Sequence, residues 1–322
     1  MFNEIPVSEN NYSEKMKEIV EPYLKEIGEE GFFEGFDKSL IHYESYIIGS
    51  PKGSVVISHG FTESAEKFRE MSYYFTLMGY NVFAIDHRGH GKSERITEDP
   101  ATVSVNHFSD YVNDLNIFVN RVVKVKSGKL PLYLYSHSMG GAVAIQYLQE
   151  YPYDFKKAIL SSPMVMPQCH GMKPGAARAL TAAFCALGQK NKQVFVYDGF
   201  NPDITHEQSH DTSKARFDYY HEKRKNDETL QTASASYRWV MEAVGVSKKN
   251  LDIDRCKRIK VPVLICQPES DSSVYSDKED KFLTLIPNGI IKKFVNCRHE
   301  IYMSVDDTVL EYINEIEAFL CC

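Results

Sequence analysis

The amino-acid sequence predicts an α/β fold, with a mostly parallel central sheet flanked by helices and a helical cap inserted late in the chain. Short apolar runs alternate with segments whose apolar residues recur every three or four positions. Apolar runs without polar alternation are typical of parallel strands that are buried on both faces. The alternation stops between residues 163 and 250, and these 88 residues are too many for a loop. We therefore expect an α/β core formed by residues 1–162 and 251–322, with a helical cap at 163–250 covering the substrate.

The predicted elements follow in chain order. Residues 1–40 are charged and weakly apolar, which predicts a helix and an approach segment before the sheet. Apolar and β-branched runs predict six strands, at residues 55–57, 82–85, 132–135, 158–160, 261–266 and 290–295. Apolar residues at helical spacing predict amphipathic helices at residues 68–78, 112–122, 139–149 and 309–320.

Composition and charge exclude several classes of function. The 322 residues are 43% hydrophobic and carry a net charge of −7, which is typical of a globular protein and unfavourable for nucleic-acid binding. The first residues lack a basic and apolar leader, and no apolar run reaches the roughly 18 residues of a spanning helix. The seven cysteines are scattered, without a C-x-x-C pair. We expect a cytoplasmic protein with reduced thiols, at most peripheral at the inner face of the membrane. Its oligomeric state stays open.

The sharpest local feature surrounds Ser138, which lies between a predicted strand and a predicted helix. A serine at such a turn projects its hydroxyl above the sheet edge, and small neighbours are needed because the turn is crowded. Gly140 and Gly141 supply small residues after Ser138, and Ser136 stands where the G-x-S-x-G pattern has its first glycine. The alternative is an ordinary serine N-cap. The strand–turn–helix context favours a nucleophile.

Candidates for the acid and the base follow the last two predicted strands. Glu269 and Asp271 come after the fifth predicted strand, and His299 comes after the sixth. A serine hydroxyl becomes a good nucleophile when an imidazole takes its proton, and a carboxylate orients and stabilises that imidazole. Because ligands of α/β sheets bind at the carboxyl ends of the strands, these groups are expected at that edge. From the residues alone, either carboxylate fits.

These motifs together resemble the α/β-hydrolase superfamily, and within it the bacterial lysophospholipase and monoacylglycerol-lipase-like group. The resemblance runs from about residue 54 to the C-terminus and rests on residues 86–93 (DHRGHGKS), 108–115 (FSDYVNDL), 136–141 (SHSMGG), 161–164 (SSPM), 237–240 (YRWV) and 299–300 (HE). It implies Ser138 as the nucleophile, Asp271 as the acid and His299 as the base of a catalytic triad. It leaves Glu269 as a non-catalytic loop residue.

The resemblance further implies that the backbone N–H groups of Phe61 and Met139 form the oxyanion hole. The expected function is that of a serine carboxylic-ester hydrolase that cleaves the acyl ester of single-chain lipids. Lysophospholipids are the first expectation for the substrate class. The alternatives are a monoacylglycerol lipase, a general carboxylesterase and, outside the enzymes, a non-catalytic α/β-hydrolase fold that binds a small ligand. No metal or organic cofactor is expected. The expected partners are the small lipid substrate and, at the surface, membrane lipid.

Two histidine-containing segments are expected to take no direct part in the chemistry. His87 and His90 lie in the turn at residues 86–93, too early in the chain for the base of an α/β-hydrolase, so this turn is expected to support the active-site loops. Residues 206–210 read H-E-x-x-H, the zinc-protease pattern, but no third ligand is suggested and helix-capping residues follow directly. We expect solvated cap surface there.

The predicted cap carries the clues to the substrate. Its aromatic residues and the three methionines between residues 163 and 174 suggest an apolar slot over Ser138 that fits an acyl chain. Trp239, the single tryptophan, is the expected wall residue of this slot, and the alternative is an anchor in the core of the cap. The cap holds 12 Lys and Arg against 9 Asp and Glu, an excess that favours a phosphate head group or an anionic bilayer.

Overall fold

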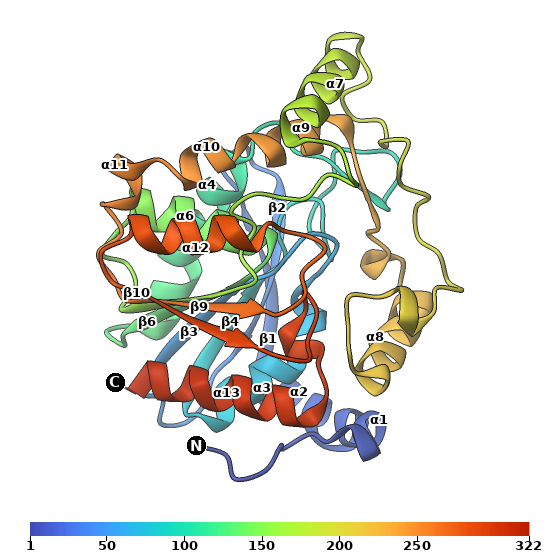
Figure 1. Ribbon diagram of the computed structural model, residues 1–322. Coiled ribbons are helices and arrows are strands. Elements are labelled where there is room, and N and C mark those ends of the chain that lie inside the picture. Colours follow the sequence, from blue (N-terminus) through green and yellow to red (C-terminus); the bar gives the residue numbers. More distant parts are fainter. Residues whose placement is uncertain (322) are drawn as a thin grey trace.

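The computed structural model describes residues 1–321 and has an eight-stranded sheet at its centre (Figure 1). The strands lie in the order β1-β2-β4-β3-β6-β7-β9-β10. β1 is antiparallel to β2, and β2 is antiparallel to β4, whereas the other neighbouring strands are parallel. The strand bounds are β1 Gly28–Glu34, β2 Leu40–Tyr46, β3 Gly53–Ser58, β4 Tyr80–Ile85, β6 Leu132–His137, β7 Lys157–Ser161, β9 Val263–Pro268 and β10 Gly289–Phe294. The sheet is therefore mixed and mostly parallel, as predicted.

Helices cover both faces of this sheet (Figure 1). The helix bounds are α1 Tyr12–Lys15, α2 Glu21–Ile27, α3 Arg69–Leu77, α4 Ser109–Phe118, α5 Lys124–Ser127, α6 Met139–Glu150, α7 Pro174–Ala186, α8 Lys214–Asn226, α9 Tyr237–Gly245, α10 Ser247–Asn250, α11 Ile253–Cys256, α12 Ser276–Leu285 and α13 Asp306–Cys321. One apolar cluster joins the sheet to α4, α6 and α12, and a second joins it to α1, α3 and α13. No helix within residues 1–321 is long and apolar enough to cross a membrane.

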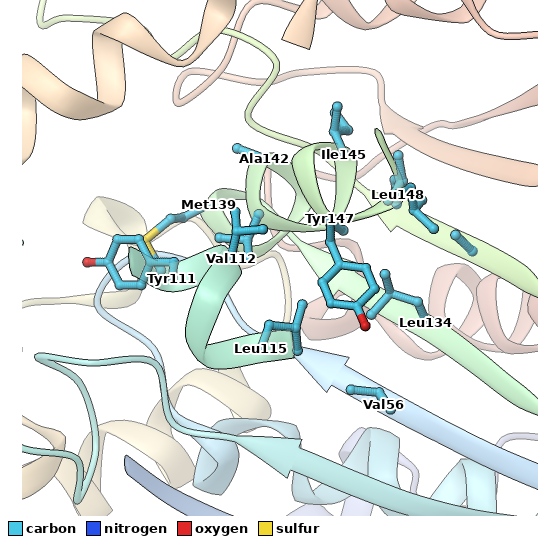
Figure 2. Packing of buried hydrophobic residues seen from close by; sticks show 14 of the residues in the cluster. Val56, Tyr111, Val112, Leu115, Leu134, Met139, Ala142, Ile145, Tyr147 and Leu148 are labelled. Atoms are coloured by element: carbon cyan, nitrogen blue, oxygen red, sulfur yellow. The ribbon is translucent and has the colours of Figure 1, made fainter. Parts of the chain in front are cut away.

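The two clusters follow from the two-residue period of a strand. In β3, Val56 belongs to the cluster under α4 and α6, while Val55 and Ile57 belong to the cluster under α3 and α13. Figure 2 shows the first of these clusters, with side chains of α4 and α6 above the strands that carry Val56 and Leu134. Burial on both faces explains why these strands are continuous apolar runs in the sequence.

The six strands predicted from apolar runs are confirmed, with shifts of a few residues at their ends. The predicted helices correspond to α3, α6, α13 and α4, and α4 continues through a π-helical turn at Val119–Val123. β9 begins two residues later than predicted, although the carbonyl of Pro262 already accepts a hydrogen bond from the Ala158 amide at 3.0 Å. The periodicity of apolar residues was thus sufficient to predict whether a segment is a helix or a strand. The exact residue at which a strand begins depended on its hydrogen bonds to neighbouring strands.

The expectation for the N-terminal region is wrong in one respect, because residues 28–46 form a β-hairpin that extends the sheet. β1 is rich in glutamate and glycine, and β2 contains His42 and Glu44, so neither strand is an apolar run. The buried carboxylate of Glu44 accepts hydrogen bonds from Arg69 at 2.8 Å and from the Tyr46 hydroxyl. Burial of these polar strand residues depends on partners distant in the sequence, which a local pattern does not contain.

Residues 163–250 contain α7 to α10 and the two-residue strand β8 (Ser234–Ala235), which pairs in parallel with β5 (Thr102–Val103). α7 packs on α9, and α8 lies beyond the ends of β9 and β10 to which their arrows point (Figure 1). α8 begins at Lys214, with the Ser213 hydroxyl accepting a hydrogen bond from the Arg216 amide, as its sequence predicts. The division into a core and a cap stays a prediction, since α9 and α10 also pack on the core.

Candidate active site

Ser138 lies at the sharp turn between β6 and α6. Its backbone has a φ of +49°, a left-handed conformation that side chains rarely adopt. The turn leaves no room for larger neighbours, because a Cβ on Gly140 would lie 2.1 Å from the carbonyl oxygen of Ser58. A Cβ on Gly141 would lie 2.6 Å from Pro163. Ser136 is tolerated in place of the usual glycine because it is buried and its hydroxyl donates to the Ile159 carbonyl at 3.3 Å.

The three residues predicted as a triad lie in one chain of hydrogen bonds. His299 Nε2 lies 2.8 Å from Ser138 Oγ, and His299 Nδ1 lies 2.7 Å from Asp271 Oδ2. These contacts join residues 161 and 28 positions apart in the sequence. An imidazole between a hydroxyl and a carboxylate can take the serine proton, while the carboxylate holds the ring in the required tautomer. The arrangement is suited to nucleophilic attack by Ser138.

The surroundings of the two carboxylates differ. Asp271 Oδ1 accepts hydrogen bonds from the amides of Ser273 and Val274, at 2.8 and 3.0 Å. Burial opposes its charge, but His299 and these amides hold the pKa of Asp271 below its ordinary value. Glu269 instead accepts a hydrogen bond from the Asn296 amide at 3.1 Å, so it fastens the loop after β10. Asp271 is thus the carboxylate in contact with His299.

The segment after β3 carries Phe61, one of the two predicted oxyanion donors, and Met139 begins α6 directly after Ser138. Within residues 1–321, neither backbone amide has a protein acceptor. An amide at the start of a helix, beside a nucleophile, is suited to bind an oxyanion because the first N–H groups of a helix lack partners. The assignment of both donors stays a prediction.

The turn at residues 86–93 holds the loop that carries Phe61. Asp86 Oδ1 accepts a hydrogen bond from the Ala65 amide at 2.6 Å, and Asp86 Oδ2 lies 2.8 Å from His42 Nδ1. His59 accepts a hydrogen bond from the His87 amide at 2.9 Å. His87 and His90 are completely buried, and burial lowers the pKa of both. These contacts agree with a supporting role and not with a base.

The H-E-x-x-H segment does not form the helix that a zinc site of this kind needs. The short 3₁₀-helix at His206–Gln208 ends before His210, so the two histidines do not share a helical face. His210 lies against His299, with 6.2 Å between the ring centroids. Within residues 1–321, no three His, Cys, Asp or Glu side chains gather as metal ligands.

A cavity of about 460 Å³ opens over Ser138 and His299. Its walls come from the loops after β3, β6, β9 and β10 and from the 163–250 segment. Trp239 lines this cavity from α9, where it is 5% exposed. The Trp239 ring lies 4.0 Å from the Phe61 ring, and its Nε1 donates to the Tyr111 hydroxyl at 3.1 Å. Trp239 therefore both lines the cavity and packs in the core.

Sequence reasoning missed a second set of buried ionisable groups beside the triad. Glu63 lies two residues after Phe61, and His137 lies directly before Ser138. Their side chains are 3.0 Å apart although the residues are 74 positions apart. Each residue flanks a motif that the sequence analysis identified, so proximity to those motifs was the available signal. The pairing itself is a tertiary contact.

The fold and the hydrogen-bonded serine, histidine and aspartate define a serine hydrolase of the lipase and esterase kind. The chain belongs to the hydrolase family described as serine aminopeptidase, S33, whose model matches residues 49–306. A probable lysophospholipase L2 of Haemophilus influenzae is 26% identical over 269 residues, which cover 83% of each chain. Lysophospholipase L2 of Escherichia coli K12 is 27% identical and covers 80% of this chain and 75% of its own.

A relative named as a monoglyceride lipase is more similar over a shorter stretch. Human monoglyceride lipase is 36% identical over 118 residues, 37% of each chain. A structure of a monoglyceride lipase variant from Saccharomyces cerevisiae superposes with a TM-score of 0.73 at 20% identity, covering 91% of this chain and 95% of its own. The structure of a carboxyl esterase from Bacillus coagulans superposes with a TM-score of 0.74 at 18% identity, covering 91% of this chain and 97% of its own. Similarity at these identities shows the common fold.

Proposed function

We propose that this protein is a lysophospholipase, which hydrolyses the acyl ester of a lipid that has one fatty-acid chain. The observation that carries the proposal is that the cavity over Ser138 continues in two directions of opposite chemistry. One continuation is apolar and fits an acyl chain. The other is lined by ionisable groups and fits a polar head group.

The apolar continuation is a slot of about 120 Å³ between α7 and α9. It shares Tyr197 and Trp239 with the cavity over Ser138, so an acyl chain attached at the serine can enter it directly. Its further walls include Leu180, Val194 and Val240. Each methylene buried in such a slot contributes about 0.8 kcal/mol, which favours long acyl chains.

The polar continuation is a cavity of about 250 Å³ that shares Thr62, His210 and Glu300 with the cavity over Ser138. It begins beside His299, the side on which a leaving alcohol would take its proton. Lys67 and Arg224 line it as cations. This placement favours the head group, and not the acyl chain, as the occupant.

The charge balance of the polar cavity favours an anionic head group. Burial and the neighbouring Glu300 raise the pKa of Asp211 well above its ordinary value, which favours its neutral form. Glu300 itself is ionised, since Lys67 Nζ lies 2.6 Å from its carboxylate and lowers its pKa. With Asp211 neutral, two cations face one carboxylate among the groups that line this cavity, while Glu63, 3.5 Å from Lys67, is paired with His137. This balance suits a phosphodiester better than a neutral glycerol.

In the proposed reaction, His299 takes the proton of Ser138 as the serine oxygen attacks the ester carbonyl. The N–H groups of Phe61 and Met139 stabilise the negative charge on the tetrahedral oxygen. The intermediate collapses to an acyl-enzyme as His299 protonates the leaving glycerol oxygen. Water, deprotonated by His299, then attacks the acyl-enzyme, and the fatty acid and the free serine are released.

A monoacylglycerol lipase is the second candidate, favoured by the 36% identity to human monoglyceride lipase over 118 residues. Both candidates use the same acyl slot and differ in the group that enters the polar cavity. A general carboxylesterase would use the serine without depending on either continuation. The head group is therefore the variable that separates the first two.

The deciding experiment is a substrate panel in which the two lipids carry the same single oleoyl chain. It compares kcat/KM for oleoyl lysophosphatidylcholine and monooleoylglycerol, beside p-nitrophenyl butyrate and an aminoacyl p-nitroanilide. Because hydrogen bonds to charged groups contribute about 1.5–3 kcal/mol, we expect the lysophospholipid to be preferred over the monoacylglycerol by at least about tenfold. Equal or lower kcat/KM for the lysophospholipid would refute the proposal in favour of the monoacylglycerol. Cleavage of the nitroanilide alone would refute an ester hydrolase.

A further inference from the structure

A histidine outside the triad touches both the nucleophile and the base regions of the site. His137 precedes Ser138, and its side chain is completely enclosed against the 299–302 loop. Its Nδ1 lies 3.0 Å from Glu63 Oε2, and its Nε2 lies 3.3 Å from the carbonyl oxygen of His299. A carboxylate and a backbone carbonyl are both acceptors only, so each ring nitrogen must carry a hydrogen. The geometry therefore requires the doubly protonated imidazolium.

Glu63 connects three loops that carry separate parts of the reaction. Its Oε2 accepts a hydrogen bond from the Gly60 amide at 2.5 Å, next to the predicted oxyanion donor Phe61. Its Oε1 accepts one from the Tyr302 hydroxyl at 2.5 Å, three residues after the base. Through His137 it reaches the turn that bears Ser138. A single buried carboxylate thus fixes the oxyanion loop, the nucleophile turn and the base loop.

The charges around His137 favour its protonated form. Burial alone would disfavour the charge, but Glu63 and, to a lesser degree, Glu300 raise the pKa of His137 above its ordinary value, against the effect of Lys67. The other polar groups that face the ring are the imidazole of His299, with centroids 4.9 Å apart, and the side chain of Tyr302. In turn, burial opposes the charge of Glu63, while His137 and Lys67 lower its pKa well below the ordinary value. The two groups are therefore ionised together.

We propose that the Glu63–His137 ion pair is a positioning unit, which holds the oxyanion loop and His299 at their working distances from Ser138 and fails when His137 loses its proton. The unit rests on the proposed function only in that Ser138 and His299 perform the chemistry. The imidazolium of His137 contacts no reacting atom. Its effect on the rate comes through the backbone of His299 and, by way of Glu63, through Gly60.

The expected consequence for the pH dependence has a definite sign. At alkaline pH His137 loses a proton, so one of its two hydrogen bonds is lost and Glu63 keeps only Lys67, with Nζ 3.5 Å from Oε1, as a cationic partner among the described residues. The positioning is present below the raised pKa of His137 and is lost as the pH rises through it. The kcat profile therefore has an alkaline limb that belongs to His137.

The test compares His137→Gln and Glu63→Gln with the control His42→Gln. In the control, the buried imidazole also lies between two acceptors, here both carboxylates, with Nδ1 2.8 Å from Asp86 and Nε2 3.3 Å from Glu30, but it does not line the cavity. kcat and KM for p-nitrophenyl butyrate, and the rate of fluorophosphonate labelling, are measured across pH, with Tm alongside. A misplacement of about 1 Å can cost 10²-fold, so we expect His137→Gln to lower kcat by about 10- to 100-fold with KM unchanged.

Two further results are expected if the unit works as proposed. His137→Gln loses the alkaline limb, and Glu63→Gln moves that limb to lower pH because His137 loses its carboxylate partner. His42→Gln lowers Tm and leaves the alkaline limb where it is in the parent. An alkaline limb retained at the same pH in His137→Gln, or a kcat within twofold of the parent, would overturn the proposal.

Failure of the substrate assignment gives a different result. A parent protein that hydrolyses p-nitrophenyl butyrate but no lysophospholipid refutes the proposed lysophospholipase activity and leaves the pH comparison of the variants intact. If His137→Gln unfolds at the assay temperature, Glu63→Gln still tests the proposal. Its alkaline limb is compared with that of the parent, and His137 is present in both proteins.

Discussion

The two sides of the active-site cavity are built differently. On the side of the sheet, Ser138, His299 and Asp271 have their polar side-chain atoms paired at 2.7–3.0 Å, and Glu63 and His137 are paired as well. On the side of the 163–250 segment, His221 Nδ1 and the Tyr220 hydroxyl belong to residues that line the polar cavity, and these atoms have no protein partner within residues 1–321. The named groups on the first side are satisfied without a ligand, and the two named atoms on the second side are not.

This difference suggests that the two sides of the cavity have different tasks, catalysis on the side of the sheet and substrate selection on the side of the 163–250 segment. Catalytic groups work best when they are held in place before the substrate arrives, because no reorganisation is then needed in the transition state. Groups that select a substrate gain from being unpaired, because the correct ligand supplies their missing partner. Changes on the sheet side should therefore affect every substrate alike, and changes on the side of the 163–250 segment should alter the ratio between substrates.

The largest effect is expected for Ser138→Ala. Removal of the nucleophile should lower kcat by about 10³-fold or more for every ester, because only the oxyanion hole and binding remain. Tm should stay close to that of the parent, since alanine keeps the strand–helix turn. Activity within tenfold of the parent would show that another residue is the nucleophile.

A smaller but still uniform effect is expected for the carboxylate that contacts His299. Asp271→Asn should lower kcat by about 10²- to 10⁴-fold, because the amide favours the wrong tautomer of His299. Glu269→Gln is the matched control, since this carboxylate lies two residues away and bonds only the Asn296 amide among residues 1–321. Steady-state kinetics of the two variants give the comparison. A larger loss for Glu269→Gln would assign the role of the acid to Glu269.

The smallest loss, and the most selective one, is expected for Trp239→Ala. Truncation removes a wall shared by the apolar slot and the cavity over Ser138, so long acyl chains should lose binding that short chains never had. Four methylenes at about 0.8 kcal/mol each correspond to roughly two orders of magnitude in kcat/KM between long and short esters of the parent. We expect this ratio to fall by about tenfold in the variant.

Thermal stability is the control for Trp239→Ala, because the residue also packs against Phe61 and donates to Tyr111. An unchanged ratio of long-chain to short-chain kcat/KM, together with a lowered Tm, would leave Trp239 as a core anchor. That result would also contradict the separation of chemistry from selection between the two sides of the cavity.

Periodicity and strand–helix alternation were sufficient for the parallel sheet, because strands buried on both faces must be continuously apolar. They were insufficient for β1 and β2, whose buried His42 and Glu44 are tolerated only through the hydrogen bonds of Asp86, Arg69 and Tyr46. The turn at Ser138 was predictable because its crowding demands small residues nearby in the sequence. Constraints that act between neighbouring residues can therefore be recognised in the sequence.

The sequence by itself determined the fold class, the order of the main elements and the candidates Ser138, His299 and either Glu269 or Asp271, because each follows a recognisable strand. Only the tertiary structure decided which carboxylate contacts His299, and that Glu63 and His137 form an ion pair beside it. It also decided that the cavity has one apolar and one ionisable continuation. The physical reason is that pairing energies depend on distance in space, and residues 28 to 161 positions apart carry no local signal of their contact.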